Sequence, residues 1–484
     1  MIRRGELPAA GQDPVGPAAE ERVDPRRWWM LPVILIGSFL SFLDFFIVNI
    51  ALPAIRTDLH ATPGALQFVV AAYGVGFAVT LITGGRLGDI FGRKRIFMLG
   101  IGGFTLASLL CGIAPDAASL IGARVLQAVT AATVTPQVLA IIRTEFPPRE
   151  RATAIGLYGT SMGLASITGQ VFGGFLVASD LFGWSWRLIF LVNLPVGLLA
   201  MVLAAGIVRE SRGDGKPTLD WGGVGLASLG LFLLIYPVVA GREAGWPAWS
   251  FLMLAGVAPM LVAFIAYERR VTRTGRTPLI ALHLLSVGTI RLGLVTSAAF
   301  FLGLGVFFVV MTVTLQAGFG LSPLQTGLLF MPFAVSFSVA SSASGRVTAR
   351  LGPRILNLGT GLMAAGLVIV LAACGSGLPI GWVAVGFAVY GLGQGLTQPG
   401  LINTVIGGSG VSGGDTGSAV GLFLTTAQSC IAFGVAAIGD VFFARLGVAP
   451  ALRDYLAAVS LTLWCNLALL AVTFVLALGL PRRH

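Results

Sequence analysis

Long apolar runs alternate with short polar segments along most of the chain. A helix that crosses a lipid bilayer needs about 20 mainly apolar residues, and fourteen runs meet that requirement. The pattern therefore predicts an all-α integral membrane protein with fourteen transmembrane helices. We expect the spans at 28–50, 64–84, 96–114, 118–142, 152–178, 187–208, 221–240, 250–267, 291–316, 323–345, 355–374, 380–406, 416–444 and 459–480.

The composition agrees with a membrane location and excludes an ordinary water-soluble fold. Hydrophobic residues make up 56% of the 484 residues and charged residues 11%, whereas soluble domains have about 25% charged residues. The 66 glycines suit close packing of helices in lipid, where small residues let backbones approach. The four cysteines show neither CxxC nor metal-ligand spacing, so we expect no disulfide framework and no metal site; they are Cys111, Cys374, Cys430 and Cys465.

Basic residues are distributed unevenly between the polar segments. The net charge is +11, but lysine and arginine recur in short segments between apolar runs, which indicates membrane orientation and no nucleic-acid partner. With a cytoplasmic N-terminus, 25 of the 31 basic residues fall in cytoplasmic segments, five fall outside and Arg124 lies within a span. Cytoplasmic loops are enriched in Lys and Arg, so we expect both termini in the cytoplasm and a multi-pass protein of the inner (plasma) membrane. Residues 1–27 are polar, and we interpret them as a disordered cytoplasmic tail.

Two pairs of segments indicate an internal duplication. The run 85–94 has an echo at 345–354, displaced by 260 residues, and 128–136 has an echo at 391–399, displaced by 263. Chance similarity between apolar segments of low complexity is the alternative. Two six-helix pseudo-symmetric bundles with two peripheral inserted helices fit these offsets, and parallel repeats of this kind are a known transporter plan. The expected domains are an N-terminal bundle at 28–208, an inserted helix pair with its connecting loops at 209–285 and a C-terminal bundle at 286–484.

The polar run from Gly85 to Arg95 lies between two spans and is rich in glycine. Glycines permit a sharp turn between closely spaced helices, and the basic residues favour the cytoplasmic side. An ordinary basic loop would explain the arginines and the lysine. It would not explain the spaced glycines and the single acidic residue, Asp89.

Several segments resemble the major facilitator superfamily, and in particular its group of 14-helix drug:proton antiporters. The loop 85–97 is similar to the first-hairpin motif of that superfamily, which implies a gating role for Gly85, Asp89, Gly92 and Arg93 in docking one half against the other. The segment 43–53 resembles the first-helix motif of the 14-helix group, although Phe46 stands where a small hydroxyl residue is usual. The segment 186–197 is similar to the start of this group's sixth helix.

The fourth and fifth spans carry further parts of this resemblance. Arg124 with Gln127 is similar to the motif associated with proton coupling, with Ala128 in place of the usual glycine. The segment 165–174 resembles the antiporter motif, but Gln170 replaces its proline, which weakens the inference of exchange. The resemblance implies a helix-interface role for Gly169, Gln170, Gly173 and Gly174. We expect the fifth span and its repeat partner to form the contact between halves, although static packing explains these glycines as well.

Asp44 lies near the middle of the first span. An ionisable residue there costs at least ~2.5 kcal/mol unless it faces a polar cavity, so we expect Asp44 to face the central cavity. Low dielectric disfavours a carboxylate and a nearby cation favours it, so a carboxyl group balanced between the two can load and release protons. Our hypothesis is that Asp44 couples proton and substrate movement. The alternative is a hydrogen bond that ties the first span to a neighbour.

Two other charged residues are candidates for proton coupling. Arg124 is the basic residue placed deep in a span, and arginine stays charged, so it can tune a carboxylate but cannot carry the proton. A permanent tie between helices of the first half is the structural alternative. Asp440 is a second acidic candidate in the opposite half. A boundary error of one turn would place it at the membrane interface.

Substrate contacts are expected from aromatic and methionine side chains on inner helices. Packing or lipid contact is the alternative for each of them. The candidates for the substrate cavity are Phe42, Phe46, Tyr73, Met162, Met311 and Phe330.

The preferred function is export of hydrophobic, cationic small molecules (drugs) in exchange for protons by alternating access. Two alternatives remain open, namely a dedicated exporter of one endogenous metabolite or antibiotic, and a polar-nutrient transporter of the same fold. A receptor role leaves the repeat and the buried charges without a common purpose, and an ATP-driven pump lacks a GxxxxGK[ST] loop. We find no nucleophile–base pair for an enzyme. The expected partners are a small-molecule substrate, protons and the bilayer, with a proton gradient in place of a cofactor, and we expect a monomer.

Overall fold

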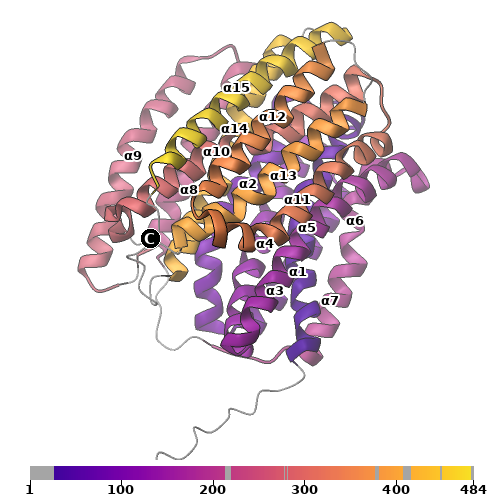
Figure 1. Cartoon of the computed structure of the whole chain (residues 1–484). Coiled ribbons are helices and arrows are strands. Elements are labelled where there is room, and N and C mark those ends of the chain that lie inside the picture. The colour runs from indigo at the N-terminus through magenta and orange to yellow at the C-terminus, as the bar shows by residue number, and fades with distance from the viewer. Residues whose placement is uncertain are drawn as a thin grey trace, which may run out of the picture.

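The computed structural model describes residues 27–212, 220–276, 278–280, 282–375, 381–406, 416–446 and 450–480. Within these ranges every regular element is a helix, as the long apolar runs predict (Figure 1). The tail expected at 1–27 lies outside the described residues except for its last position. The N-terminal half contains α1 (Arg27–Asp58), α2 (Pro63–Phe91), α3 (Arg93–Gly112), α4 (Ala117–Glu145), α5 (Pro148–Ser179), α6 (Leu188–Leu191) and α7 (Asn193–Ile207).

The inserted pair and the C-terminal half follow. The inserted pair consists of two helices, and six further helices form the C-terminal half. The first of these six continues into a short π-helical turn at Thr314–Gly318. These elements are α8 (Trp221–Glu243), α9 (Ala248–Arg273), α10 (Gly288–Val313), α11 (Pro323–Leu351), α12 (Arg354–Gly375), α13 (Gly381–Ile406), α14 (Thr416–Arg445) and α15 (Leu452–Leu478).

Thirteen helices are long and apolar enough to cross a membrane, with α6 and α7 together forming one broken span. The fourteenth expected span, 380–406, is the 26-residue helix α13, which is not among those thirteen but packs between α11 and α12. The protein is therefore a multi-pass membrane protein with about fourteen spans. We call the end of the bundle that carries the 85–95 hairpin the basic side, and the opposite end the far side.

Helices that begin on the far side carry clear start signals in the sequence. The hydroxyl of Thr62 accepts a hydrogen bond from a backbone N–H in the first turn of α2, and Pro63 follows it. Asp116 and Ser322 form capping boxes at the starts of α4 and α11, each three residues before the partner that completes the box. A side chain that accepts from the free N–H groups of a first turn fixes where the helix begins.

The packing of the helices confirms the duplication. In the N-terminal half α2 and α3 pack on α4, α5 and α7 pack on α1, and α3 packs on α7. In the C-terminal half α11 and α12 pack on α13, α14 and α15 pack on α10, and α12 packs on α15. Each of these contacts in one half thus has its counterpart in the other, with α1 corresponding to α10 and α5 to α14. The two six-helix bundles are therefore pseudo-symmetric, as the sequence echoes predict.

The two halves meet along two main seams, α2 with α14 and α5 with α11. The pseudo-symmetry exchanges these two seams, because α2 corresponds to α11 and α5 to α14. We expected the fifth span to meet its repeat partner across the interface, and this pairing was wrong. Both α5 and its counterpart α14 lie at the interface, but their main contacts across it are α11 and α2 respectively.

The described contacts close the interface at its far side. The amide of Gln316 donates to the carbonyl of Ile50 at 2.8 Å, and this bond joins α1 to the turn after α10. Two glycines make the α5–α11 seam tight. A Cβ atom on Gly174 would lie 2.5 Å from the carbonyl oxygen of Pro323, and one on Gly327 would lie 2.3 Å from that of Gln170. At these points backbone therefore meets backbone directly.

The inserted pair lies at the edge of the bundle (Figure 1), as expected, but α8 is less peripheral than α9. Besides its partner α9, α8 contacts both α2 and α14. Ile235 and Val239 of α8 are buried with Ala71 of α2 and with Ala432 and Ala436 of α14. One inserted helix therefore covers a seam between the two halves.

An ion pair on the basic side joins the first turns of α1 and α5. The guanidinium of Arg27 donates to both carboxylate oxygens of Glu150 at 2.8 Å, and these bonds lower the pKa of Glu150. A lowered carboxyl pKa gives stability that is present above the ordinary value and is lost as pH falls through the lowered one. We expect Glu150→Gln to reduce slightly the thermal stability at neutral pH and to flatten its decline in acid. Thermal unfolding in detergent across acidic to neutral pH would measure this, and an unchanged acid profile would contradict it.

Candidate functional site

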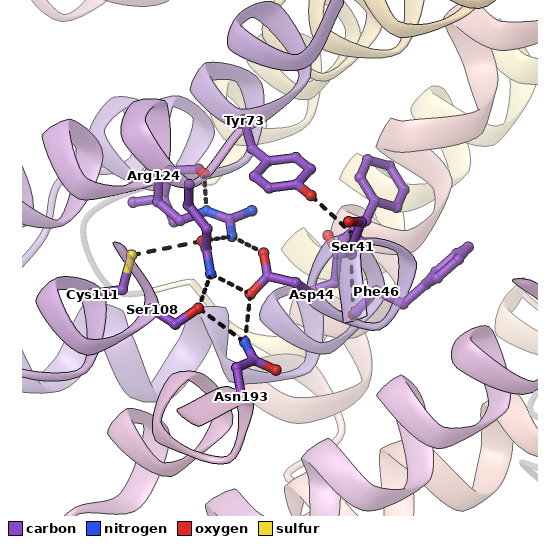
Figure 2. A network of polar contacts seen from close by, with 12 residues as sticks. Ser41, Asp44, Phe46, Tyr73, Ser108, Cys111, Arg124 and Asn193 are labelled. Carbon is purple, nitrogen blue, oxygen red and sulfur yellow. Dashed lines mark hydrogen bonds and ion pairs between the residues drawn. The ribbon is translucent and has the colours of Figure 1, made fainter. Parts of the chain in front are cut away.

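A network of polar side chains is buried inside the N-terminal half (Figure 2). Asp44 of α1 and Arg124 of α4 are 0% and 1% exposed, and the guanidinium Nη1 of Arg124 donates directly to the Asp44 carboxylate. The sequence could not show whether these two residues meet. The structure brings them together as a buried ion pair.

Amide groups surround this pair and complete its hydrogen bonds. Gln127 lies one turn after Arg124, so both face the same side of α4. Its side chain accepts from Arg124 at 2.7 Å and donates to Asp44 at 2.8 Å and to the hydroxyl of Ser108 at 2.8 Å. The amide of Asn193, at the start of α7, donates to Asp44 and to Ser108 at 3.3 Å each. Asp44 thus accepts hydrogen bonds from side chains of two other helices, α4 and α7.

Arg124 is held by backbone and aromatic groups as well as by the carboxylate. Its Nε donates to the carbonyl of Val69 in α2 at 3.2 Å. Its guanidinium carbon lies 4.3 Å from the ring centre of Tyr73 and 5.8 Å from that of Phe190. Aromatic faces attract a guanidinium, and the attraction grows when water is excluded. These contacts hold the arginine side chain in place within the bundle.

The surroundings of Asp44 differ from those the sequence predicts. We expected this residue to face the central cavity between the halves, but it is fully buried and its hydrogen-bond partners all belong to the N-terminal half. The reason is local, because Arg124, Gln127 and Asn193 supply inside one half the polar contacts that a wet cavity would otherwise provide. Because these partners enclose Asp44 completely, a proton could reach its carboxyl group only after they rearrange.

The remaining candidate for proton coupling is separate from this network. Asp440 lies in α14 of the C-terminal half and is partly buried. Its neighbour Gly439 faces Gln67 of α2, so this part of α14 lies at the interface between halves. Within the described residues, Asp440 is not among the hydrogen-bond partners of the Asp44 network. The structure therefore does not unite the three charged candidates.

The hairpin is held mainly by the segment that follows α7. Asp89 and Arg93 pair with each other at 3.0 Å. Gly92 has a φ of +107°, which a residue with a side chain rarely adopts, and the Glu210 carboxylate fills the space where its Cβ would lie. Gly85, one of the expected gating residues, lies over Pro136 of α4. These contacts lie within the N-terminal portion of the chain, so docking of the hairpin against the other half stays a prediction.

The four residues of the helix-interface motif face two different neighbours. Gly169 and Gly173 approach α1, where their Cβ atoms would lie 2.9 and 2.5 Å from side chains of that helix. Gly174 and the backbone of Gln170 face α11 across the seam. The side chain of Gln170 is buried, and both of its polar atoms are without a hydrogen-bond partner among the described residues. The motif therefore packs its own half and also contacts the other half.

The aromatic and methionine candidates divide into three groups. Tyr73 belongs to the polar network, with its hydroxyl donating to the carbonyl of Ser41 at 3.0 Å. Phe46 lies on the other side of α1 (Figure 2) and contacts Phe308 of α10 edge to face, with ring centres 5.6 Å apart. Phe330 stacks on another ring within the C-terminal core. Met311 is buried there too, whereas Phe42 and Met162 are partly buried.

Two members of these sites had little or no signal in the sequence. Ser108 lies in an ordinary apolar run of α3, and only its contacts with Gln127 and Asn193 reveal it. Glu210 follows α7 in a polar segment that we counted for its basic residues alone. Its position beside Gly92 depends on how the chain folds back after α7.

Two duplicated six-helix halves that meet along tight seams, with an ion pair buried inside one half, define a secondary membrane transporter. No group of metal-binding side chains occurs in the described part of the chain. Residues 34–435 match the family model of the Major Facilitator Superfamily. The chain belongs to this family.

Similar proteins agree with this family. The chain is 39% identical over 445 residues to the probable actinorhodin transporter of Streptomyces coelicolor, covering 91% of this chain and 77% of that protein. It is 40% identical over 370 residues to the puromycin resistance protein pur8 of Streptomyces alboniger, covering 75% and 71%. Its fold resembles the crystal structure of a D-xylose-proton symporter, with a TM-score of 0.67, 14% identity, and coverage of 94% and 97%.

Proposed function

We propose that this protein exports hydrophobic, cationic small molecules in exchange for protons by alternating access. Membership of the Major Facilitator Superfamily supports transport, and the names of the relatives, a probable actinorhodin transporter and a puromycin resistance protein, support export of antibiotic-like compounds. The imposed proton gradient supplies the energy, and no cofactor takes part. The basic side faces the cytoplasm of the cell whose plasma membrane holds the protein, and the working unit is a monomer.

The buried pair of Asp44 and Arg124 carries the proposal of proton coupling. Arginine cannot give up its proton under cellular conditions, so a proton that joins this site must go to Asp44. Protonation leaves the arginine charge without its counter-ion in a dry bundle, which is strongly unfavourable. Asp44 therefore takes up a proton only when the arginine finds other charge or water. This requirement links protonation to a change of structure.

The interface between halves supplies the element that changes. Contacts from Ile50 to Gln316 and along the α5–α11 seam hold the far side closed. The side chain of Phe46, two residues after Asp44 on α1, reaches Phe308 of the other half. Movement of α1 at the site thus acts on the interface, where an apolar substrate would meet aromatic rings. Competing occupancy of the site by the proton and by a cationic substrate then couples their movements.

Proteoliposomes with an imposed pH gradient test this function. We expect lipophilic cations to drive proton movement across the membrane, measured with a pH-sensitive dye, and neutral drugs to do so less well. Liposomes without protein, under the same gradient, control for passive leakage. Failure of every compound in a broad panel would contradict export of many drugs.

A dedicated exporter of one endogenous product is the second candidate. It is favoured by the 39% identity to a protein named for a single compound, actinorhodin. A narrow exporter would move protons with one compound class and ignore the rest of the panel. The same assay therefore separates the two candidates.

A further inference from the structure

A second cluster of buried charged groups lies on the basic side, away from Asp44. Glu268 of α9 is 0% exposed, and Asp220, immediately before α8, is 7% exposed. The carboxylate of Asp220 accepts from the backbone N–H of Gly223 at 2.9 Å and from that of Leu279 at 3.0 Å. Glu268 accepts from the N–H of Ile280 at 3.0 Å. The two carboxyl groups therefore fasten the segment 278–280 to the inserted pair.

The same segment is fastened to the hairpin from the other direction. Arg86, at the basic end of α2, donates to the carbonyl of Pro278 and lies close enough to Asp220 and Glu268 to interact with their charges. Leu279 is buried beneath this contact, and the chain continues to α10, the first helix of the C-terminal half. Arg86, the segment 278–280 and the two carboxyl groups together form a strap, which joins α2 of one half to the start of the other.

The two carboxyl groups lie close enough together to share a proton. A Cβ atom on Gly223 would lie 2.4 Å from Oε1 of Glu268 and 2.5 Å from Oδ2 of Asp220, so both oxygens converge on the space this glycine leaves empty. Oε1 of Glu268 is buried and receives no donor from the described residues. Two ionised carboxylates so close together repel each other, whereas one proton between them forms a hydrogen bond.

Neighbouring groups determine which carboxyl group holds that proton. Burial raises the pKa of Asp220, but donors from Gly223, Glu268, Tyr267 and Leu279 outweigh burial and lower it. Asp220, which faces Arg86 of α2, therefore favours the ionised form, and a shared proton would reside on Glu268. Among the described residues, the other titratable or charged groups at this site are the Tyr267 hydroxyl, which lies against Gly222, and Arg276, whose charge acts on Tyr267.

We propose that Asp220 and Glu268 form a proton-binding site, and that its occupancy decides whether the inserted pair holds the hairpin through the strap. With the proton present, the two carboxyl groups attract each other and the segment 278–280 stays bound. Loss of the proton puts two negative charges side by side in a buried place, where they repel each other, and the strap opens. Only the part that this strap would play in transport rests on the proposed alternating access. Proton binding and strap opening stand without it.

Hydrogen–deuterium exchange of the intact protein in detergent or nanodiscs tests the proposal. Exchange is followed at the backbone amides of Leu279 and Ile280 and corrected for the intrinsic pH dependence of exchange. In the wild type we expect corrected exchange to accelerate about tenfold per pH unit once Glu268 loses its proton. In Glu268→Gln the side-chain amide can donate a hydrogen bond to Asp220 and cannot be deprotonated. The corrected exchange of this variant is therefore expected to be slow at every pH. Glu145→Gln, a neutralised acid at the end of α4 on the same side, is the matched control and should behave like the wild type.

A second variant keeps the test decisive if Glu268→Gln does not fold. Asp220→Asn also removes the repulsion and is expected to abolish the pH dependence. A pH dependence that persists in Glu268→Gln or in Asp220→Asn would overturn the proposal. Exchange does not depend on turnover, so a wild type that behaves as expected here but moves no protons with substrate would refute the transport function alone.

Discussion

Replacement of Asp44 by asparagine is expected to abolish proton-driven transport while the protein still folds. The asparagine side chain can keep hydrogen bonds to Gln127 and Asn193, but it cannot bind and release a proton. Arg124 then lacks its counter-ion in a bundle that excludes water, and removal of one partner of a buried ion pair costs about 3–5 kcal/mol. We therefore expect a large fall in thermal stability as well as the loss of substrate-dependent proton movement in proteoliposomes.

The double variant Asp44→Asn with Arg124→Gln separates coupling from packing. Neutralising both partners removes the unpaired charge, so stability should return toward the wild type. Proton-driven transport should stay absent. Full proton-driven transport by Asp44→Asn would refute the coupling role, and a double variant that regains transport together with stability would show that the pair is only a structural tie.

Replacement of Gly327 by alanine is expected to open the far side of the interface. The new Cβ would lie 2.3 Å from the carbonyl oxygen of Gln170, and this oxygen belongs to the backbone of the opposite half. Gly327 and Gln170 can separate when the halves rock, so the clash penalises one state and not the fold. Overpacking by a methyl group costs typically about 1–3 kcal/mol, which corresponds to a shift of about 5–150-fold between two states.

Gly391 provides the matched control, because its Cβ would also lie 2.3 Å from a backbone carbonyl oxygen, that of Phe333. Both of these residues belong to the C-terminal half, in α13 and α11, so the clash cannot be relieved by rocking. We expect Gly391→Ala to lower thermal stability without opening the interface.

The readout is the reactivity of a cysteine introduced at Ile50, in a background without the four native cysteines. Ile50 is fully buried in the closed interface, so a thiol at this position reacts with a water-soluble reagent only when the far side opens. Gly327→Ala should raise its rate of labelling and Gly391→Ala should not. Equal labelling rates in the two variants would contradict the assignment of this crossing to the moving interface.

The sequence predicts the helices of this protein well because their signals are local. Span length, basic loops and cap residues such as Thr62 and Asp116 act within a few residues of each helix end. The duplication was also readable, since the echoes survive in glycines and prolines that the backbone geometry requires. The repeated packing of α1 to α5 in α10 to α14 follows from it.

The surroundings of Asp44 could not be predicted in the same way. Hydropathy gives the depth of a residue in the membrane but not the direction in which its side chain points. The i, i+3 spacing of Arg124 and Gln127 does indicate a shared polar face on α4. That Asp44 meets this face, inside one half, depends on the positions of Ser108 in α3 and Asn193 in α7, which are far apart in the sequence.

The inserted helices were likewise only partly predictable from the sequence. Their low burial was predictable from their few polar residues, and α9 follows that expectation. Glu268 looks like an ordinary acid near a helix end until folding places it against Asp220 and below the segment 278–280. A contact between a carboxyl group and a distant loop leaves no periodic trace in the sequence.

The bare backbone crossings at Gly174 and Gly327 have a consequence for the speed of the transport cycle. Van der Waals contacts and weak Cα–H···O contacts hold such a crossing, and each of them is individually small. Among the described residues, no hydrogen bond or ion pair at Gly174 or Gly327 has to break before the two helices separate there. The rate of the transport cycle should accordingly depend on the lateral pressure of the membrane and the order of its acyl chains more than on ionic strength.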